Sequence, residues 1–135
     1  MTDRDEFLDW FKTTWQTAED ALHNGDPGPR LATWSDLAPV TLFGAWFNAM
    51  DPEATRAVFH KLASSFADLS SSVIELVAAE VSGDLAYTVH REITSTSVDG
   101  APSDYVLRVT QVYRREGGEW KVVHRHGDTD PESAD

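Results

Sequence analysis

The second half of the chain alternates apolar and polar residues with a period of two, and this pattern constrains the fold more than any other feature. It covers residues 85–93, recurs over 105–113 and recurs again over 120–126. Such alternation is typical of β-strands with one covered face. Gly117 and Gly118 separate the last two runs, as expected for a tight hairpin turn. We therefore expect long antiparallel strands joined by hairpins.

The first half of the chain shows helical spacing instead. An apolar stripe runs from Phe7 to Leu22, and Asp-Pro pairs at 26–27 and 51–52 are typical starts of two further helices. Residues 40–43 predict a short strand. Because helices and long strands are segregated along the chain, we expect an α+β domain with its helices on one face of a curved sheet.

The length of 135 residues leaves room for one domain. We expect residues 1–128 to form it and residues 129–135 to be an acidic, flexible tail. The absence of cysteine excludes disulfides, thiolate chemistry and zinc–thiolate sites. No phosphate-binding glycine loop or dinucleotide fingerprint occurs, so no organic cofactor is expected.

The net charge of −12 opposes phosphate backbones and anionic lipids, so we expect neither nucleic acid nor a membrane as a partner. No apolar run is long enough to cross a membrane, and no signal peptide is visible at the N-terminus. We therefore expect a cytoplasmic protein.

The pairing register decides which side chains face the covered side of the sheet. A two-residue turn at 117–118 places Gln111 opposite His124. Keeping the apolar residues of the preceding hairpin on that face excludes a two-residue turn at 99–100, and predicts a three- or five-residue loop or a bulge. The covered face then carries four polar side chains, Arg91, Gln111, His124 and His126. Unpaired polar groups there cost roughly 1–3 kcal/mol each, so the cluster predicts a wet or ligand-binding cavity.

His126 and His124 are the candidate acid–base residues of this cavity, and Arg91 is the candidate group for a carboxylate or a developing oxyanion. The alternatives are hydrogen-bonded core histidines and an arginine paired with an acid. Asp128 completes a His-x-His-x-Asp pattern that is common by chance, so we predict no metal. The candidate substrate-binding residues are Gln111, Tyr87, Tyr113, Trp34, Trp46 and Phe43.

Four segments, together with Arg30 and Trp34-Ser35, carry a family resemblance: HNGD at 23–26, VTLFG at 40–44, SGDLAYT at 82–88 and WKVVHRH at 120–126. They are similar to segments of the SnoaL-like group of the nuclear-transport-factor-2-like (NTF2-like) superfamily, to which ketosteroid isomerase belongs. The resemblance implies a conical α+β barrel of the cystatin-like type. It also implies an apolar pocket for a small hydrophobic molecule at the wide end and a homodimer formed through the sheet. From the residues alone, the end of one helix and the start of the next explain the first segment.

Departures from the superfamily limit the expected activity. Its steroid isomerases carry a carboxylate base just after the first short strand, where residues 42–45 read Leu-Phe-Gly-Ala, and an oxyanion acid that 107–111 lacks. Isomerase chemistry by that mechanism is therefore not expected. Of the Asp-Arg-Asp constellation of its epoxide hydrolases, only Arg91 is available on the expected inner face. Its ring-forming kinase-association domains share the Trp-x-x-x-His-x-His ending, which makes a structural role for both histidines credible.

Two hypotheses of function follow. In the first, the protein is a cofactor-free lyase, isomerase or cyclase acting on a hydrophobic carbonyl compound, with His126 or His124 moving the proton. In the second, it is a non-catalytic, dimeric ligand-binding or assembly module. Internal hydrogen bonds that saturate the polar residues favour the second hypothesis, and an open pocket onto which His126 and Arg91 converge favours the first.

Overall fold

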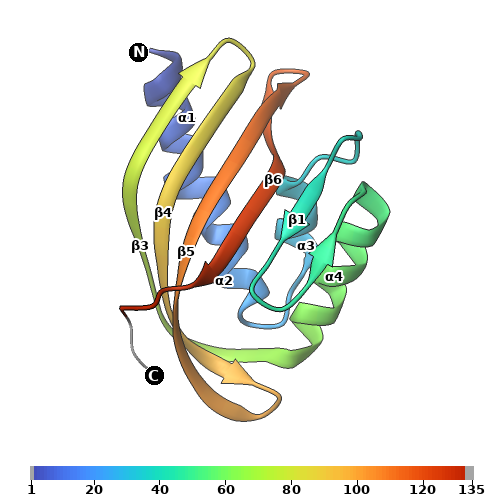
Figure 1. The fold of residues 1–135 in the computed structure, drawn as a ribbon, viewed down its shortest axis with the longest axis vertical. Helices are drawn as coiled ribbons and strands as arrows, with labels where there is room; N and C mark the ends of the chain where they lie inside the picture. The colour runs from blue at the N-terminus through green and yellow to red at the C-terminus, as the bar shows by residue number, and fades with distance from the viewer. Residues whose placement is uncertain (1, 133–135) are drawn as a thin grey trace.

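A six-stranded sheet in the order β2-β1-β6-β5-β4-β3 curves around the N-terminal helices in the computed structural model, which describes residues 2–132 (Figure 1). Its strands are β1 (Thr41–Phe43), β2 (Asn48–Ala49), β3 (Phe66–Ser82), β4 (Leu85–Val98), β5 (Ala101–Glu116) and β6 (Glu119–Thr129). The helices are α1 (Asp3–Trp10), η1 (Phe11–Trp15), α2 (Gln16–Leu22), α3 (Gly28–Thr33) and α4 (Pro52–Ser65). Paired strands are antiparallel except β1 and β6, which are parallel. The expected α+β fold with a curved sheet is confirmed.

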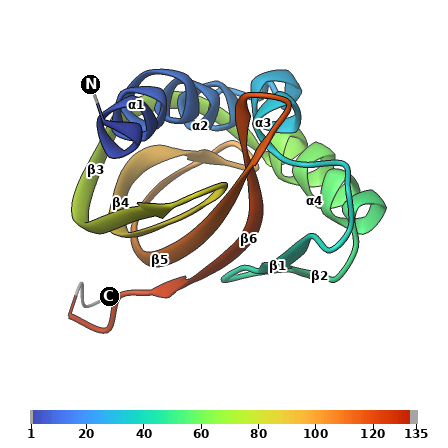
Figure 2. The ribbon, with the colours of Figure 1, turned by 90° about the horizontal axis from the view of Figure 1, so that it is seen from above.

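The N-terminal helices form one continuous rod that lies across the hollow of the sheet (Figure 2). A capping box starts the rod: the Thr2 hydroxyl accepts from the Asp5 backbone N–H, and the Thr2 N–H donates to the Asp5 carboxylate. Phe7, Phe11 and Trp15 lie on the face toward the sheet and are fully buried. Burial of each such side chain stabilises the fold by about 1.5–3 kcal/mol, so this face holds the rod on the sheet.

The β5–β6 hairpin begins as expected and then changes register. Glu116 pairs with Glu119 across the turn at 117–118, which confirms that turn. A bulge follows, so that Gln111 pairs with Arg125 and not with His124. The extra residue reverses the faces of the rest of β6. The expectation that His124 and His126 point inward is therefore wrong, and Arg125 points inward in their place.

The β4–β5 hairpin contradicts the expected register from its first residue. Val98 pairs with Ala101 across a two-residue turn, the kind of turn that the apolar pattern excluded. Asp99 and Gly100 both have positive φ angles, of 51° and 83°, as this tight turn type requires. The alternation in β4 is real, but its apolar residues lie outside and its polar residues lie inside. The expected inward position of Arg91 is therefore also wrong.

The described part of the expected C-terminal tail is held against the sheet. Thr129 pairs with Leu107, and the Asp130 backbone N–H donates to the carbonyl oxygen of Val106. The carboxylate of Asp130 also pairs with Arg91 at 2.9 Å. Residues 133–135 of this tail lie outside the described residues, so the domain boundary stays a prediction.

Within residues 2–132, no helix combines the length and the apolar composition that a membrane crossing requires.

Candidate functional site

A buried ion pair between Arg125 and Glu92 joins β6 to β4 inside the curved sheet. Two hydrogen bonds of 2.7 Å run from the guanidinium Nη1 and Nη2 to the two carboxylate oxygens. Burial by itself raises the pKa of Glu92, but the charge and the hydrogen bonds of Arg125 outweigh it and hold that pKa well below its usual value. Conversely, burial lowers the pKa of Arg125, and Glu92 outweighs burial and raises it. Both side chains are therefore charged.

Four further buried side chains extend this pair into a closed ring of six hydrogen-bonded residues. In order they are Arg125, Gln111, Tyr113, Thr88, His90 and Glu92, with successive distances of 2.9, 2.5, 2.7, 3.2 and 2.9 Å and a closing distance of 2.7 Å. Because the Gln111 amide and Arg125 can only donate through nitrogen, the two hydroxyl groups must point the same way around the ring. A neutral His90 that carries its proton on Nε2 then gives every link one donor and one acceptor. The ring is saturated within the protein.

A second buried ion pair, between Glu19 of α2 and Arg30 of α3, lies beside the ring. The Arg30 Nε is 2.8 Å from one carboxylate oxygen, and its Nη2 donates to the other. The Nη1 atom of Arg125 lies 3.8 Å from Glu19 Oε1, so the two pairs are in contact. Two guanidinium groups and two carboxylates give a net charge of zero, and they connect the helical layer to the sheet.

A cavity of about 40 Å³ lies next to these two ion pairs. His23, Arg30, Glu92, Tyr105 and Arg125 contribute its polar wall. Apolar side chains complete the lining, among them Leu42, Phe47, Leu62, Phe66 and Leu107. The volume is enough for one or two water molecules, so a larger ligand requires part of the wall to move.

Trp46 is the wall residue best placed to move. It belongs to the segment between β1 and β2, its side chain is 55% exposed, and its ring meets the Tyr105 ring edge-on at 5.4 Å. A side chain that is half exposed and touches one polar wall residue is weakly held. We therefore place the mouth of the cavity at Trp46.

His23 and Tyr105 form a hydrogen-bonded pair in the polar wall. The Nδ1 atom of His23 lies 2.7 Å from the Glu19 carbonyl oxygen and donates to it, so Nε2 accepts from the Tyr105 hydroxyl at 2.7 Å. Burial lowers the pKa of His23, although the nearby Glu19 partly opposes this, and burial also raises the pKa of Tyr105. Both side chains are therefore neutral near pH 7.

His23 was not among the candidate residues. The helix stop beside it is confirmed, since Gly25 has a positive φ of 91°, but the side chain of His23 turns inward past that stop. Its sequence signals were its place at the end of an amphipathic helix and its membership of the HNGD segment, which helix capping explained. Glu19, Arg30 and Glu92 were missed as well, because each is a charged residue at a position where the pattern predicts solvent.

The candidate residues from the sequence fall into three groups. Gln111 and Tyr113 belong to the buried ring, and Trp46 lies at the cavity mouth. Trp34 is buried in the core, with its ring 4.8 Å from that of Phe59, and does not line the cavity. The remaining candidates lie on the outer face of the sheet, and the expectation that they line the interior is wrong: Arg91, His124, His126, Phe43 and Tyr87.

The outer-face residues have partners of their own. Arg91 pairs with Glu75 at 2.8 Å, and His124 Nδ1 lies 2.7 Å from the Thr41 hydroxyl. Arg91 and His126 line a shared concavity of about 390 Å³ on that face. Within residues 2–132, no three His, Cys, Asp or Glu side chains are grouped so that they could hold a metal ion. Any catalytic role of the outer-face residues stays a prediction, and it has no connection with the interior cavity.

The family model of the SnoaL-like domain matches residues 12–127. No curated protein matches the sequence. A protein of the NTF2-like family from Streptomyces avermitilis, provisionally described as a dehydratase, has a similar structure, with a TM-score of 0.75, 17% identity, and coverage of 93% of this chain and 97% of its own.

Two further solved structures are similar. A kinase association domain from Thiobacillus denitrificans, provisionally assigned to the calcium/calmodulin-dependent type II class, has a TM-score of 0.73 at 17% identity, over 88% of this chain and 94% of its own. A ketosteroid isomerase-like protein from Erwinia carotovora atroseptica has a TM-score of 0.72 at 14% identity, over 90% of this chain and 95% of its own. At such identities these likenesses establish the fold alone.

We predict that Glu92→Gln lowers the free energy of unfolding by about 3–5 kcal/mol, because it leaves the buried charge of Arg125 without its main partner. The matched control is Glu75→Gln, which removes one of the two carboxylate partners of the half-exposed Arg91 and should cost at most about 1 kcal/mol. Urea unfolding of both variants measures the difference. Equal losses in the two variants would show that the buried ring does not organise the interior.

Proposed function

The chain belongs to the SnoaL-like group of the NTF2-like superfamily, and from this premise we propose that it binds a small molecule in its interior cavity without catalysis. The observation that carries the proposal is the mixed lining of the cavity. Apolar side chains make up much of it, and the rest presents the His23–Tyr105 pair among ion pairs that are already satisfied. Saturated hydrogen bonds in the ring leave its residues no free group for chemistry, which favours binding over turnover.

The charge of the polar wall favours a neutral ligand. Arg30 and Arg125 are each paired with a buried carboxylate, so the wall has no net charge. A carboxylate ligand would lose its hydration without gaining a free cation, which is costly in a buried site. An alcohol needs only one hydrogen bond, which its hydroxyl can donate to the Tyr105 oxygen, and a ketone can accept the Tyr105 proton in place of His23 Nε2. The ligand class we propose is therefore an apolar alcohol or ketone that displaces Trp46 as it enters.

Lyase or isomerase chemistry is the second candidate, and the geometry of His23 and Tyr105 favours it. If a ligand carbonyl takes the hydrogen bond of the Tyr105 hydroxyl, the Nε2 lone pair of His23 becomes free. A proton on the carbon next to that carbonyl can then pass to Nε2, while Tyr105 stabilises the oxygen. The dehydratase description of the Streptomyces avermitilis neighbour is in keeping with such chemistry. In this role His23 replaces His124 and His126.

The outer face of the sheet supports a proposed homodimer. Val73, Val77, Leu85 and Tyr87 expose 48%, 67%, 53% and 40% of their surface on β3 and β4. Apolar patches of this kind mark contact surfaces in soluble proteins. A second copy that packs its own sheet against this face would cover them, as would be expected of an assembly module.

We predict that benzyl alcohol or cyclohexanone stabilises the protein in a thermal-shift assay more than benzoate or cyclohexanecarboxylate does. Tyr105→Phe should weaken the binding of the neutral ligands about fivefold in calorimetric titration, because it removes one neutral hydrogen bond of about 1 kcal/mol. Tyr87→Phe, on the outer face, is the matched control and should have no effect. Tighter binding of the carboxylates would contradict the neutral ligand class, and no binding of any compound would contradict the interior site.

If catalysis occurs, the exchange of α-protons of cyclohexanone in D2O, followed by NMR, should be faster with the protein than in buffer. We predict that the rate falls as the pH decreases through the pKa of His23, which burial sets below 6.5, since only the neutral ring has a free lone pair. His23→Gln should lower the enhancement at least 100-fold. An exchange rate equal to that of buffer leaves binding alone as the function.

We predict that the wild-type chain sediments as a dimer and that Val77→Lys sediments as a monomer, because a buried lysine would disrupt the proposed interface. Met50→Lys is the control, since Met50 is 70% exposed at the junction of β2 and α4, away from this face. Analytical ultracentrifugation measures both. A monomeric wild type, or a dimer unaffected by Val77→Lys, would contradict an interface through the sheet.

A further inference from the structure

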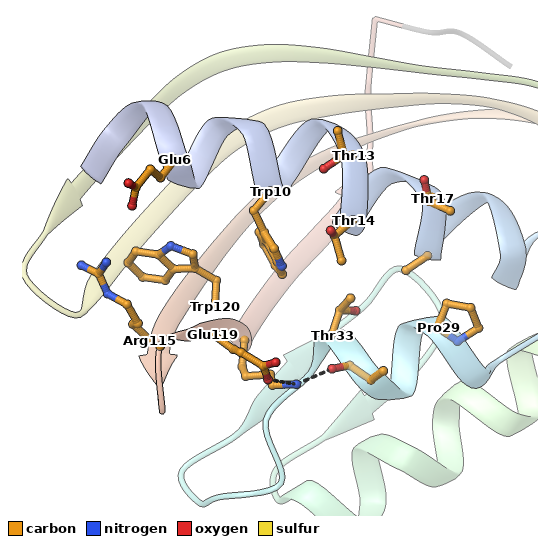
Figure 3. Close-up of a pocket in the computed structure, with 14 residues that line it drawn as sticks. Glu6, Trp10, Thr13, Thr14, Thr17, Pro29, Thr33, Arg115, Glu119 and Trp120 are labelled. Atoms are coloured by element: carbon orange, nitrogen blue, oxygen red, sulfur yellow. Dashed lines mark hydrogen bonds and ion pairs between the residues drawn. The ribbon is translucent and has the colours of Figure 1, made fainter. Parts of the chain in front are cut away.

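A second groove, of about 1040 Å³, lies between the N-terminal helices, α3 and the β5–β6 hairpin (Figure 3). It shares no lining residue with the interior cavity. Small-molecule sites have volumes of about 300–1,000 Å³, so the groove has room for a ligand of ordinary size. Neither the proposed binding in the interior nor the proposed dimer uses it.

The indole of Trp10 projects into this groove from α1 (Figure 3). It is held from the core side: its ring lies 6.0 Å from that of Phe7 at an angle of 28°, and it meets Tyr113 edge-on at 5.8 Å. The side chain is half-buried, so part of the indole remains accessible. A tryptophan fixed in this way is a rigid, flat, apolar platform.

Exposed threonines line the helical wall of the groove beside Trp10. Thr13 donates to the carbonyl oxygen of Asp9, whereas the hydroxyls of Thr14 and Thr17 have no hydrogen-bond partner among residues 2–132. Threonine is less favourable in a helix than alanine by about half a kcal/mol, so these two residues weaken the helix without a bond in return. Part of this wall is the π-helical η1, and such segments are frequent at functional sites.

The basic residues of the groove already have partners. Lys121 donates to the carbonyl oxygen of Ala32 at 2.6 Å, and Arg115 donates to that of Gly83 at 2.8 Å while its guanidinium lies 4.7 Å from the centre of the Trp120 ring. Two basic side chains, Arg115 and Lys121, and two acidic ones, Glu6 and Glu119, line the groove, so its formal charge is zero. The groove therefore has no net charge and no unpaired basic group, so an anionic ligand would find no free cation in it.

We propose that this groove binds a neutral saccharide. A sugar ring combines an apolar C–H face with a rim of uncharged hydroxyl groups, which matches an indole platform bordered by free hydroxyls. Its apolar face stacks on Trp10, and its hydroxyl groups exchange hydrogen bonds with Thr14 and Thr17. This site is independent of the interior cavity and of its proposed ligand.

The test is a titration of the full chain with cello-, malto- and chito-oligosaccharides, followed by the NMR signals of the tryptophan indole N–H groups. Trp10→Phe assigns the Trp10 signal. We expect this signal to shift on titration, and the double variant Thr14→Val with Thr17→Val to weaken binding about tenfold, since valine keeps the shape and the β-branching while it removes two neutral hydrogen bonds. Thr110→Val, an exposed threonine on the outer side of β5, is the matched control and should bind as the wild type does.

Three results would overturn the proposal. One is that no indole signal shifts with any of the sugars. Another is that the Trp46 signal shifts in place of the Trp10 signal, which would put the sugar at the interior cavity and leave that site standing. The last is a double variant that binds as tightly as the wild type, or a Thr110→Val control that binds as weakly as the double variant.

Discussion

The bidentate pair of Arg125 and Glu92 is the interaction on which the interior depends. Neither charge can be desolvated alone, because an unpaired buried ion costs several kcal/mol, so the two side chains must meet on the same face of the sheet. That requirement agrees with the inward polar face of β4 and with the bulge in β6, which brings Arg125 opposite Gln111. Contact with Glu19 then extends the same constraint from the sheet to the helices.

Elements whose apolar residues face the core could be predicted from the sequence. The Phe7 stripe, the Asp51-Pro52 helix start and the turn at 117–118 are examples, since burial of apolar surface dominates their energetics. Prediction failed in β4, where the premise that the apolar side of the alternation faces inward was wrong. The premise fails because hydrogen bonds among Thr88, His90, Glu92 and their neighbours compensate the desolvation of an inner polar face.

The candidate site was harder to predict than the fold, because it depends on single-residue steps in register. One bulged residue in β6 exchanges His124 for Arg125 at the interior, although both belong to the same short motif. Polar side chains do gather on the inner face of the sheet, as the sequence predicted. Of the four residues predicted to lie there, however, only Gln111 does. His23 was attributed to helix capping and Glu19 was not considered, since nothing in an amphipathic pattern distinguishes a buried, paired polar residue from one in solvent.

The polar inner face of β4 leaves apolar side chains on the outer face of the sheet. With the polar positions of β4 turned inward, its apolar residues Leu85 and Tyr87 must face outward, on the same side of the sheet as the exposed Val77 of β3. The interior thus becomes electrically balanced, which suits the uncharged ligand that we propose, while apolar side chains are left exposed on the outer face. One choice of register therefore determines both the character of the cavity and the surface offered to a second molecule. For this reason we argue that the proposed ligand binding and the proposed assembly both depend on the same strand pairing.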